Sequence, residues 1–387
     1  MSNRNCLAVK IERRKKMSKT ETMPRICVGV DLHKLQFTVC GINENTGEVL
    51  VQGVFKTDTQ GYETFCEKMH GIEDSTECAI ELAVEATGNA RYFKNKMEAE
   101  GFCVVVVNTG KFKVITMSTS KTDANDAYTL AFYLSKDMLP ESHLCDQTSE
   151  EIRRMLKTRS ILVSGMVKIK NQIHGMLLGY GIETKSAQFQ SKKKRQELLN
   201  DLEDHDYSQF TASSLKVTLD ILDEICEQVK RIETQIKEMT KENEAVELLT
   251  TMPGIGFVGA TTIAAYTNNI ERFDGDFKRF ASYLGIVPSV HNSADSVRMG
   301  KITKRGPQEL RTAFVQVAMG IIRQPQNTGE WKLMQDYKTM KTSKGSGRAI
   351  IALTRKVARI VFAMLNNREA FNPDLMIKCE TKLQQVG

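Results

Sequence analysis

The sequence predicts an α/β domain with a mixed sheet, followed by long helices and a mainly helical C-terminal part. Three short β-branched runs come first, and helical and strand-like patterns then alternate, which is typical of an α/β domain. No proline occurs between Pro140 and Pro253, so long uninterrupted helices can form there. A glycine-rich turn between two apolar helical stretches follows at residues 248–266.

The first domain is predicted to contain both strands and helices, with Thr57 or Asp58 as a helix cap. Its strand-like runs are RICVGVD (25–31), LQFTVCGIN (35–43), VLVQGVF (49–55), CAIELAVE (78–85) and FCVVVVN (102–108). Its helical patterns are TDTQGYETFCEKMHGI (57–72), RYFKNKMEAEG (91–101) and TDANDAYTLAFYLSK (122–136).

Two long amphipathic helices are predicted at 150–181 and 213–239, where apolar residues recur every three or four positions. We expect them to pack antiparallel in the manner of a coiled coil, with a charged connector at 191–206. They could form an interdomain arm, an oligomer interface or a simple helical bundle. The turn within 248–266 has the pattern of a helix–hairpin–helix, whose backbone amides can face a phosphate.

Further along, residues 277–290 lead into a polar loop, and two apolar helical patterns follow it. The polar loop is HNSADSVRMGKITKRG (291–306), and the two predicted helices are PQELRTAFVQVAMGII (307–322) and RAIIALTRKVARIVFAMLNN (348–367).

Charge and cysteine content narrow the class of protein. The formal net charge is +7, and basic residues concentrate in 1–22 and 332–368, which favours a polyanionic partner. The nine cysteines include no CxxC pair, which indicates reduced and mostly buried thiols instead of disulfides or a zinc knuckle. No apolar run is long enough to cross a bilayer, and the basic start lacks a secretory pattern, so we expect a cytoplasmic protein.

Four carboxylates are predicted to gather at one edge of the sheet. Asp31 ends the first strand, Glu85 ends the fourth, and Asp123 and Asp126 lie three residues apart near the start of a helix. The carboxyl ends of strands converge on one crevice in an open α/β sheet. Such a set can hold hard divalent cations, and two Mg²⁺ ions can support phosphoryl transfer. The alternative is that each residue is an ordinary cap or surface acid.

The motifs VGVDLHK, VEATGN, a valine-rich strand and KTDANDA, in this order, resemble the RuvC-like DEDD domain of the insertion-sequence family 110 transposases. MPGIGFVGATTIAAY, RFASYLGIVPSVHNSA and GKITKRGPQELR resemble that family's transposase domain, and the whole resemblance covers about residues 25–370. The predicted parts are a basic leader (1–22), a RuvC/ribonuclease-H-like α/β domain (23–140), a helical coiled-coil arm (150–247), a mainly α, serine-bearing transposase domain (248–370) and a tail (371–387).

The resemblance implies an RNA-guided DNA recombinase of a mobile element. It implies that Mg²⁺ or Mn²⁺ is held by Asp31, Glu85, Asp123 and Asp126. It also implies a serine that attacks DNA and forms a phosphoserine intermediate. The family pattern places this serine five residues after the proline of GIVP, which is Ser293 here, followed by Ala294 where the family has glycine. Ser289 and Ser296 are the competing serines.

Cations around this loop suit contacts with the scissile phosphate, although each could be a solvated loop residue. These candidates are Arg298, Lys301, Lys304, Arg305 and Arg311, with Lys34 as a further nucleic-acid contact. Lys304 and Arg311 are favoured because they occupy family-like positions, and Gly300 and Gly306 are expected to supply turns. A serine hydroxyl needs activation by a base or a metal. No histidine–aspartate pairing is evident from the sequence, and His291 is expected to be a hydrogen-bonding loop residue.

The implied partners are element-end and target DNA, a structured noncoding guide RNA, and further copies of the chain in a dimer or tetramer with a composite site. No membrane partner is expected, and the site of action is the nucleoid of a prokaryotic cell. Two rival functions remain open. One is a metal-dependent RuvC-like junction resolvase or nuclease that uses water, and the other is an inactive DNA-binding protein.

Overall fold

The structure is a computed structural model that describes residues 24–112, 122–202, 208–293 and 296–377, without the side chains of residues 201 and 290–299. The basic leader, Ala294 and the last ten residues of the tail lie outside the described residues. The chain divides into two compact units, one that ends at Leu144 and one that begins at Cys145. Each unit is described by itself.

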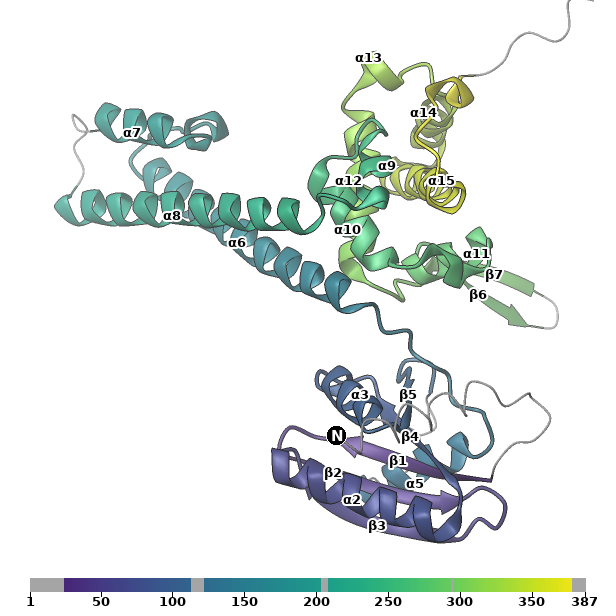
Figure 1. The fold of residues 1–387 in the computed structure, drawn as a ribbon. Coiled ribbons are helices and arrows are strands. Elements are labelled where there is room, and N and C mark those ends of the chain that lie inside the picture. The colour runs from purple at the N-terminus through teal and green to yellow at the C-terminus, as the bar shows by residue number, and fades with distance from the viewer. Residues whose placement is uncertain (1–23, 113–121, 203–207, 294–295, 378–387) are drawn as a thin grey trace, which may run out of the picture. The chain divides into compact units, whose positions relative to one another are not determined.

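The first unit is built on a five-stranded mixed sheet with the order β3-β2-β1-β4-β5. Its strands are β1 (Arg25–Leu32), β2 (Gln36–Asn43), β3 (Val49–Lys56), β4 (Ala79–Glu85) and β5 (Cys103–Val107). The pairs β1–β2 and β2–β3 are antiparallel, whereas β1–β4 and β4–β5 are parallel. The prediction of an α/β domain with a mixed sheet is therefore confirmed (Figure 1).

Alternation along the strands divides the core of this unit between the two faces of the sheet. Even-numbered residues of β1 such as Val28 pack with α2 (Thr59–Thr76) and α3 (Ala90–Ala99) in one apolar cluster. The odd-numbered Cys27 packs with α5 (Asp123–Leu134) in a second cluster. Each face therefore has its own helices, and α5 covers the face on which the odd-numbered residues of β1 lie.

At the end of the sheet where β1 begins, one arginine pairs with three carboxylates. Arg25 pairs with Glu44 at 2.7 Å, with Glu81 at 2.9 Å and with Asp137 at 3.0 Å. The hydrogen bond to Glu44 is the main cause that raises the pKa of Arg25 above its ordinary value, and it lowers the pKa of Glu44. Three carboxylates at this end therefore share a fixed cation.

The second unit begins with two long helices, α6 (Gln147–Leu178) and α8 (Gln209–Met239), which pack against each other in opposite directions (Figure 1). An apolar base cluster joins Ile152 and Leu156 of α6 to Ile236 of α8. A separate tip cluster joins the other ends of the helices and includes Ile173, Leu177, Leu215, Leu219 and Leu222. The antiparallel pairing agrees with the sequence pattern, whereas the coiled-coil geometry stays a prediction.

The prediction of a mere charged connector at 191–206 is wrong for its first part, which forms α7 (Lys192–Asp201) after a 3-10 turn η1 (Ser186–Phe189). Leu198 of α7 is buried in the tip cluster, so this helix has an apolar anchor despite its charge. Arg195 is also buried, pairs with Asp223 of α8 and donates to the Phe189 carbonyl at 2.8 Å. Packing against α8 therefore stabilises a segment whose composition alone indicates a loop.

The rest of the second unit is mainly helical and has one large apolar core. Its elements are α9 (Glu244–Thr250), α10 (Phe257–Thr267), η2 (Ile270–Phe273), α11 (Phe277–Leu284), β6 (Pro288–Ser293), β7 (Ser296–Ile302), α12 (Gln308–Ile322), α13 (Pro325–Thr328), α14 (Lys332–Lys344), α15 (Ser346–Asn367) and η3 (Pro373–Met376). The turn between α9 and α10 holds Gly254 at a φ of +90°, packed against Ile321 of α12. The interpretation of this turn as a helix–hairpin–helix stays a prediction.

The predicted polar loop at 291–306 is in large part a two-stranded antiparallel sheet, so that prediction is wrong. Residues 296–299 (SVRM) alternate polar and apolar side chains, a short strand pattern that the surrounding polar residues conceal. Pairing of β6 with β7 satisfies backbone groups that a loop would leave to water.

Five of the seven described cysteines are buried, as predicted, and all seven are free thiols. Across the described ranges, no helix is both long and apolar enough to cross a membrane.

Candidate active site

Strand register brings Asp31 and Glu85 to the same edge of the sheet. In the parallel pair β1–β4, Val30 lies opposite Val84, so Asp31 and Glu85 follow at neighbouring positions. Both come one residue after a strand position that faces α2 and α3, and therefore both lie on the face that α5 covers. The register places the two strand-end carboxylates side by side, as the sequence predicts.

Close contact between α5 and β1 brings the helix start to this edge. A Cβ atom on Gly29 would lie 1.9 Å from the Ala127 carbonyl oxygen and 2.6 Å from the Ala131 nitrogen. The helix backbone therefore rests directly on the strand backbone, two residues before Asp31. Because Asp123 and Asp126 lie in the first turn of α5, they are held near the end of β1.

The first turn of α5 is capped by a residue other than the two aspartates. The Thr122 side chain accepts a hydrogen bond from the Asn125 backbone amide at 3.3 Å. Asp123 is half exposed, and Asp126 is partly buried. Helix capping therefore does not account for Asp123, and its carboxylate is available to a ligand.

His33 is a further member of this site that the sequence motifs do not single out. Its Nε2 lies 3.2 Å from Asp31 Oδ2 and 3.6 Å from Asp123 Oδ2. The signal in the sequence is its spacing, because two residues after Asp31 a side chain returns to the same side of an extended chain. A histidine–aspartate pairing thus exists, although none is evident from the sequence.

The pKa of Asp31 reflects its burial and its charged neighbours at this edge. Burial raises the pKa of the Asp31 carboxyl above its ordinary value, His33 opposes the rise, and the carboxylates of Asp123 and Asp126 add to it. At the other end of β1, Arg25 pairs with three carboxylates. The acids therefore face an arginine at one end of this strand and a histidine at the other.

The donor set fits a divalent metal ion. Asp31, His33 and Asp123 each offer one ligand atom, and these atoms lie within 4.8 Å of one another. Carboxylate oxygens suit Mg²⁺ and Mn²⁺, and an imidazole nitrogen suits transition metals such as Mn²⁺ better than Mg²⁺. Among the described residues, Glu85 and Asp126 lie outside this compact group, and their place as ligands stays a prediction.

We expect Mg²⁺ or Mn²⁺ to raise the melting temperature of the protein above its value in EDTA. A cation at a hundred times its dissociation constant stabilises a folded site by about 2.7 kcal/mol, which corresponds to about 5–10 °C for a unit of this size. Asp31→Asn should abolish this rise. Because its pKa is raised in the fold, ionised Asp31 opposes folding as pH increases, so the variant should melt higher than the parent in EDTA at pH 7.

Thermal scans with and without metal test this expectation. Asp74→Asn is the matched control, since Asp74 is an exposed aspartate of α2 in the same unit. A metal-dependent rise that persists in Asp31→Asn would place the cation elsewhere.

The loops around this edge are tied together by Asn89. Its side-chain amide donates to the His33 carbonyl at 3.0 Å, and its Oδ1 accepts from the Thr87 hydroxyl at 3.0 Å. The exposed Lys34 follows His33, and its carbonyl accepts from the Thr57 hydroxyl at 2.7 Å. The segment 84–89 (VEATGN) therefore positions the turn after β1. Lys34 is an exposed cation beside the acidic edge.

The predicted nucleophile lies in the second unit, at the end of β6. Ser293 is the last residue of that strand and pairs with Ser296 at the start of β7, while His291 pairs with Arg298. The competing Ser289 lies four residues earlier on β6, and a Cβ atom on Gly300 would lie 2.3 Å from its hydroxyl. Ser293 and Ser296 are thus paired in register across the β6–β7 hairpin.

The loop after β7 is fixed on the end of α11. Gly285 has a φ of +68°, and a Cβ atom there would lie 2.2 Å from the Arg305 carbonyl oxygen. Gly306 has a φ of +105°, and a Cβ atom would lie 1.8 Å from the Tyr283 carbonyl oxygen. The end of α11 and the loop after β7 are thus in close backbone contact at these glycines. The positive φ of Gly306 agrees with the predicted turn there.

The cations of this loop differ in what they contact. Lys301, Lys304 and Arg305 are exposed, and Lys304 has a left-handed φ of +52°. Arg311 is partly buried and donates to the Leu284 carbonyl at 3.4 Å and the Lys304 carbonyl at 3.3 Å. Its guanidinium therefore supports the loop, whereas the three exposed side chains face solvent.

Both units match models of known families. Residues 28–182 match a DEDD transposase model of the IS110 type, described as "Transposase", and residues 246–331 match the model "Transposase IS116/IS110/IS902 family". The two matches include Asp31, Glu85, Asp123, Asp126 and Ser293.

Curated relatives extend the likeness over most of the chain. The transposase for insertion sequence element IS1111A of Coxiella burnetii is 25% identical over 89% of this chain and 90% of that protein. A probable family 20 transposase of Pseudomonas aeruginosa is 23% identical over 89% and 98%, respectively. The transposase for insertion sequence element IS1328 of Yersinia enterocolitica is 23% identical over 90% of this chain and its own full length.

Proposed function

Because the chain belongs to the IS110 family of insertion-sequence transposases, we propose that it cuts and rejoins DNA through a phosphoserine intermediate formed by Ser293. Transposases of this kind act on DNA, and the finer chemistry is our proposal. The observation that carries it is the gathering of Asp31, Asp123 and His33 around one point at the sheet edge, and the end of β4 at Glu85 and the first turn of α5 at Asp126 support it.

Asp31, Asp123, Glu85 and Asp126, with His33, would hold the divalent metal, Mg²⁺ or Mn²⁺. When bound, such a cation supplies positive charge beside the scissile phosphate. The rigid contact of α5 on Gly29 keeps the carboxylates together without a side chain between strand and helix. The acids would thereby bind and orient the metal, while the attacking hydroxyl oxygen would come from Ser293 of the second unit.

In the proposed reaction, the Ser293 hydroxyl oxygen attacks the phosphorus of one phosphodiester. A bond forms between that oxygen and phosphorus and the hydroxyl proton passes to water, while the bond from phosphorus to one deoxyribose oxygen breaks and the leaving oxygen takes a proton from water. The reverse attack by a hydroxyl of the recipient strand releases the serine and rejoins DNA. Lys301, Lys304, Arg305 and Arg298 are proposed to bind the phosphates, and Arg311 to hold the Lys304 loop.

The same proposal extends to assembly and guidance. Family resemblance supports a structured noncoding RNA that pairs with element and target DNA, so that base pairing provides sequence specificity. It also supports a dimer or tetramer in which the acids of one copy and Ser293 of another form a composite site. The predicted three-part division into α/β domain, arm and serine-bearing domain is retained in this proposal.

A denaturing gel for a covalent protein–DNA adduct tests the chemistry. The reaction contains the full chain, Mg²⁺, labelled element-junction DNA and RNA transcribed from the noncoding ends of the element. We expect an adduct that is lost in Ser293→Ala and in Asp123→Ala. Ser289→Ala and Ser296→Ala are the matched controls and should retain it.

Two outcomes would select the rival functions. Cleavage without an adduct, insensitive to Ser293→Ala and abolished by Asp123→Ala, identifies a metal-dependent nuclease that uses water. Metal-independent DNA binding without strand cleavage identifies a DNA-binding protein that has lost catalysis.

A further inference from the structure

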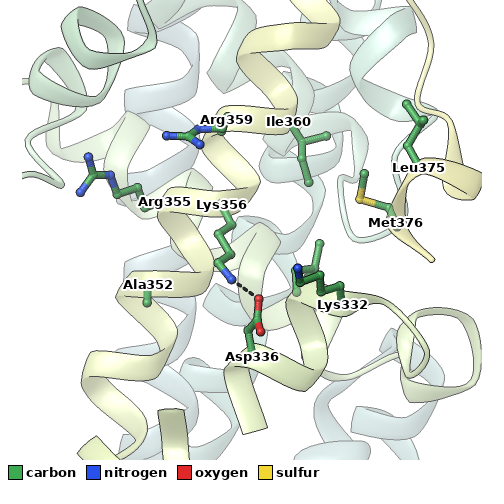
Figure 2. Close-up of a pocket in the computed structure, with 10 residues that line it drawn as sticks. Lys332, Asp336, Ala352, Arg355, Lys356, Arg359, Ile360, Leu375 and Met376 are labelled. Carbon is green, nitrogen blue, oxygen red and sulfur yellow. Dashed lines mark hydrogen bonds and ion pairs between the residues drawn. The ribbon is translucent and has the colours of Figure 1, made fainter. Parts of the chain in front are cut away.

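A hollow of about 570 Å³ lies between α14, α15 and η3, in the second unit and within the size range of ligand-binding pockets (Figure 2). Its two flanks differ in chemistry. Figure 2 shows Arg355 and Arg359 on one flank, and Ile360, Leu375 and Met376 on the other. None of these residues belongs to the acidic edge or to the Ser293 hairpin.

The arginines of α15 form a stripe along its exposed face. Arg348, Arg355 and Arg359 are spaced by seven and four residues, which places them within about 40° of one another around the helix. The opposite face, which includes Val357 and Val361, is fully buried. The stripe is about 17 Å long, the rise of about five stacked nucleotides.

Local acids leave this stripe largely uncompensated. Residues 332–368 contain nine basic residues and one acidic residue, Asp336. Asp336 pairs with Lys356, as Figure 2 shows. Within the described part of the chain, no carboxylate pairs with Arg355 or Arg359, and the Arg359 guanidinium lies 4.9 Å from the centre of the Phe277 ring. The two arginines are therefore positioned and available to an anion.

The second flank offers apolar surface to the same ligand. Leu375 is 76% exposed, and Ile360 and Met376 are partly buried next to it. A duplex hides the faces of its bases in the stack, whereas an unpaired nucleotide presents a base face to apolar side chains. Cations on one flank and apolar groups on the other thus match the two halves of a nucleotide.

We propose that this hollow binds a single-stranded segment of DNA, with its phosphates on Arg355 and Arg359 and one unpaired base against Leu375, Ile360 and Met376. The choice of DNA among polyanions rests on the proposed function, in which cut strands leave one duplex before they join another. The site lies outside the cutting machinery and holds a strand without reacting with it.

Fluorescence anisotropy of the full chain in EDTA, with a labelled twelve-nucleotide DNA, tests the proposal. Arg355→Gln with Arg359→Gln should weaken binding about tenfold near 100 mM salt. The slope of log affinity against log salt should fall by about 1.4, because each phosphate contact with a single strand contributes about 0.7. Leu375→Ser should weaken single-strand binding about threefold and leave binding of the matching duplex unchanged.

Lys216→Gln with Lys230→Gln is the matched control, because it removes two exposed cations from α8 with the same loss of charge. If this control lost as much affinity for the single strand as the arginine variant, net charge alone would explain the loss and the proposal would be overturned. Equal losses for duplex and single strand, with Leu375→Ser silent, would also overturn it. So would variants that lose affinity for RNA of the same sequence while they keep affinity for DNA.

Failure of the proposed chemistry is distinguishable from failure of this site. Asp31→Asn and Ser293→Ala should bind the single strand as the parent does, since neither residue lies at the hollow. Absence of the adduct with intact arginine-dependent binding contradicts only the proposed phosphoserine chemistry, whereas an adduct formed without arginine-dependent binding overturns the strand-binding site alone.

Discussion

Asp31→Asn is expected to reduce DNA strand cleavage by this transposase about a thousandfold while the protein stays folded. The substitution keeps the shape of the side chain and removes the charge at Asp31, which is more buried than Asp123. A loss of about 4 kcal/mol of transition-state stabilisation, typical of a disabled metal site, corresponds to this factor. Single-turnover cleavage of labelled element-junction DNA, under the conditions of the adduct assay, measures it.

Asp74→Asn provides the control for this prediction, because it makes the same chemical change on the exposed side of α2. The control should cleave at the parent rate. DNA affinity should be retained in both variants, which separates a loss of chemistry from a loss of binding. A parent-like cleavage rate in Asp31→Asn would remove the acidic edge from the mechanism.

Gly29→Ala should destabilise the α/β unit by at least about 3 kcal/mol. The new methyl group would lie 1.9 Å from the Ala127 carbonyl oxygen and 2.6 Å from the Ala131 nitrogen, and neither backbone atom can move without shifting α5. Overpacking of this kind costs from 1 to about 3 kcal/mol, and contact with backbone places it at the upper end. Thermal melting followed by circular dichroism should show a decrease of about 10 °C.

Gly53→Ala on β3 tests whether the effect belongs to the helix contact. A Cβ atom there would lie 3.5 Å from the Phe55 ring, which is an ordinary contact. This variant should melt close to the parent or slightly above it, since it stiffens the unfolded chain. If both glycine variants melt alike, backbone contact between α5 and β1 does not determine stability.

The strands of the first unit and the four acids expected at the edge of its sheet follow from local sequence patterns. Alternating β-branched runs indicate the strands, and strand ends converge by topology, so Asp31 and Glu85 meet wherever β1 and β4 are parallel neighbours. Asp123 and Asp126 lie on the same side of α5, as their three-residue spacing predicts, because a helix forms there. These features depend on short stretches of chain, which a single sequence contains.

Other features depend on contacts between distant segments. His33 reaches Asp123 only because α5 packs across β1. The sequence shows the spacing between His33 and Asp31, but it does not show that α5 packs there. The helix α7 exists because Arg195 and Leu198 find partners on α8 and in the tip cluster. Arg311 resembles a phosphate-binding residue in sequence, yet its guanidinium contacts two carbonyls of its own unit.

The two apolar clusters of the α6–α8 pair lie at opposite ends of the helices, so the length between them can vary. The base and tip clusters share no residue, and each closes its own end of the helix pair. Removing seven matched residues from the middle of both helices would shorten the reach by about 10 Å and leave both ends intact. Matched insertions or deletions in the middle of the two helices are therefore expected to change the length of the pair without disturbing either apolar cluster.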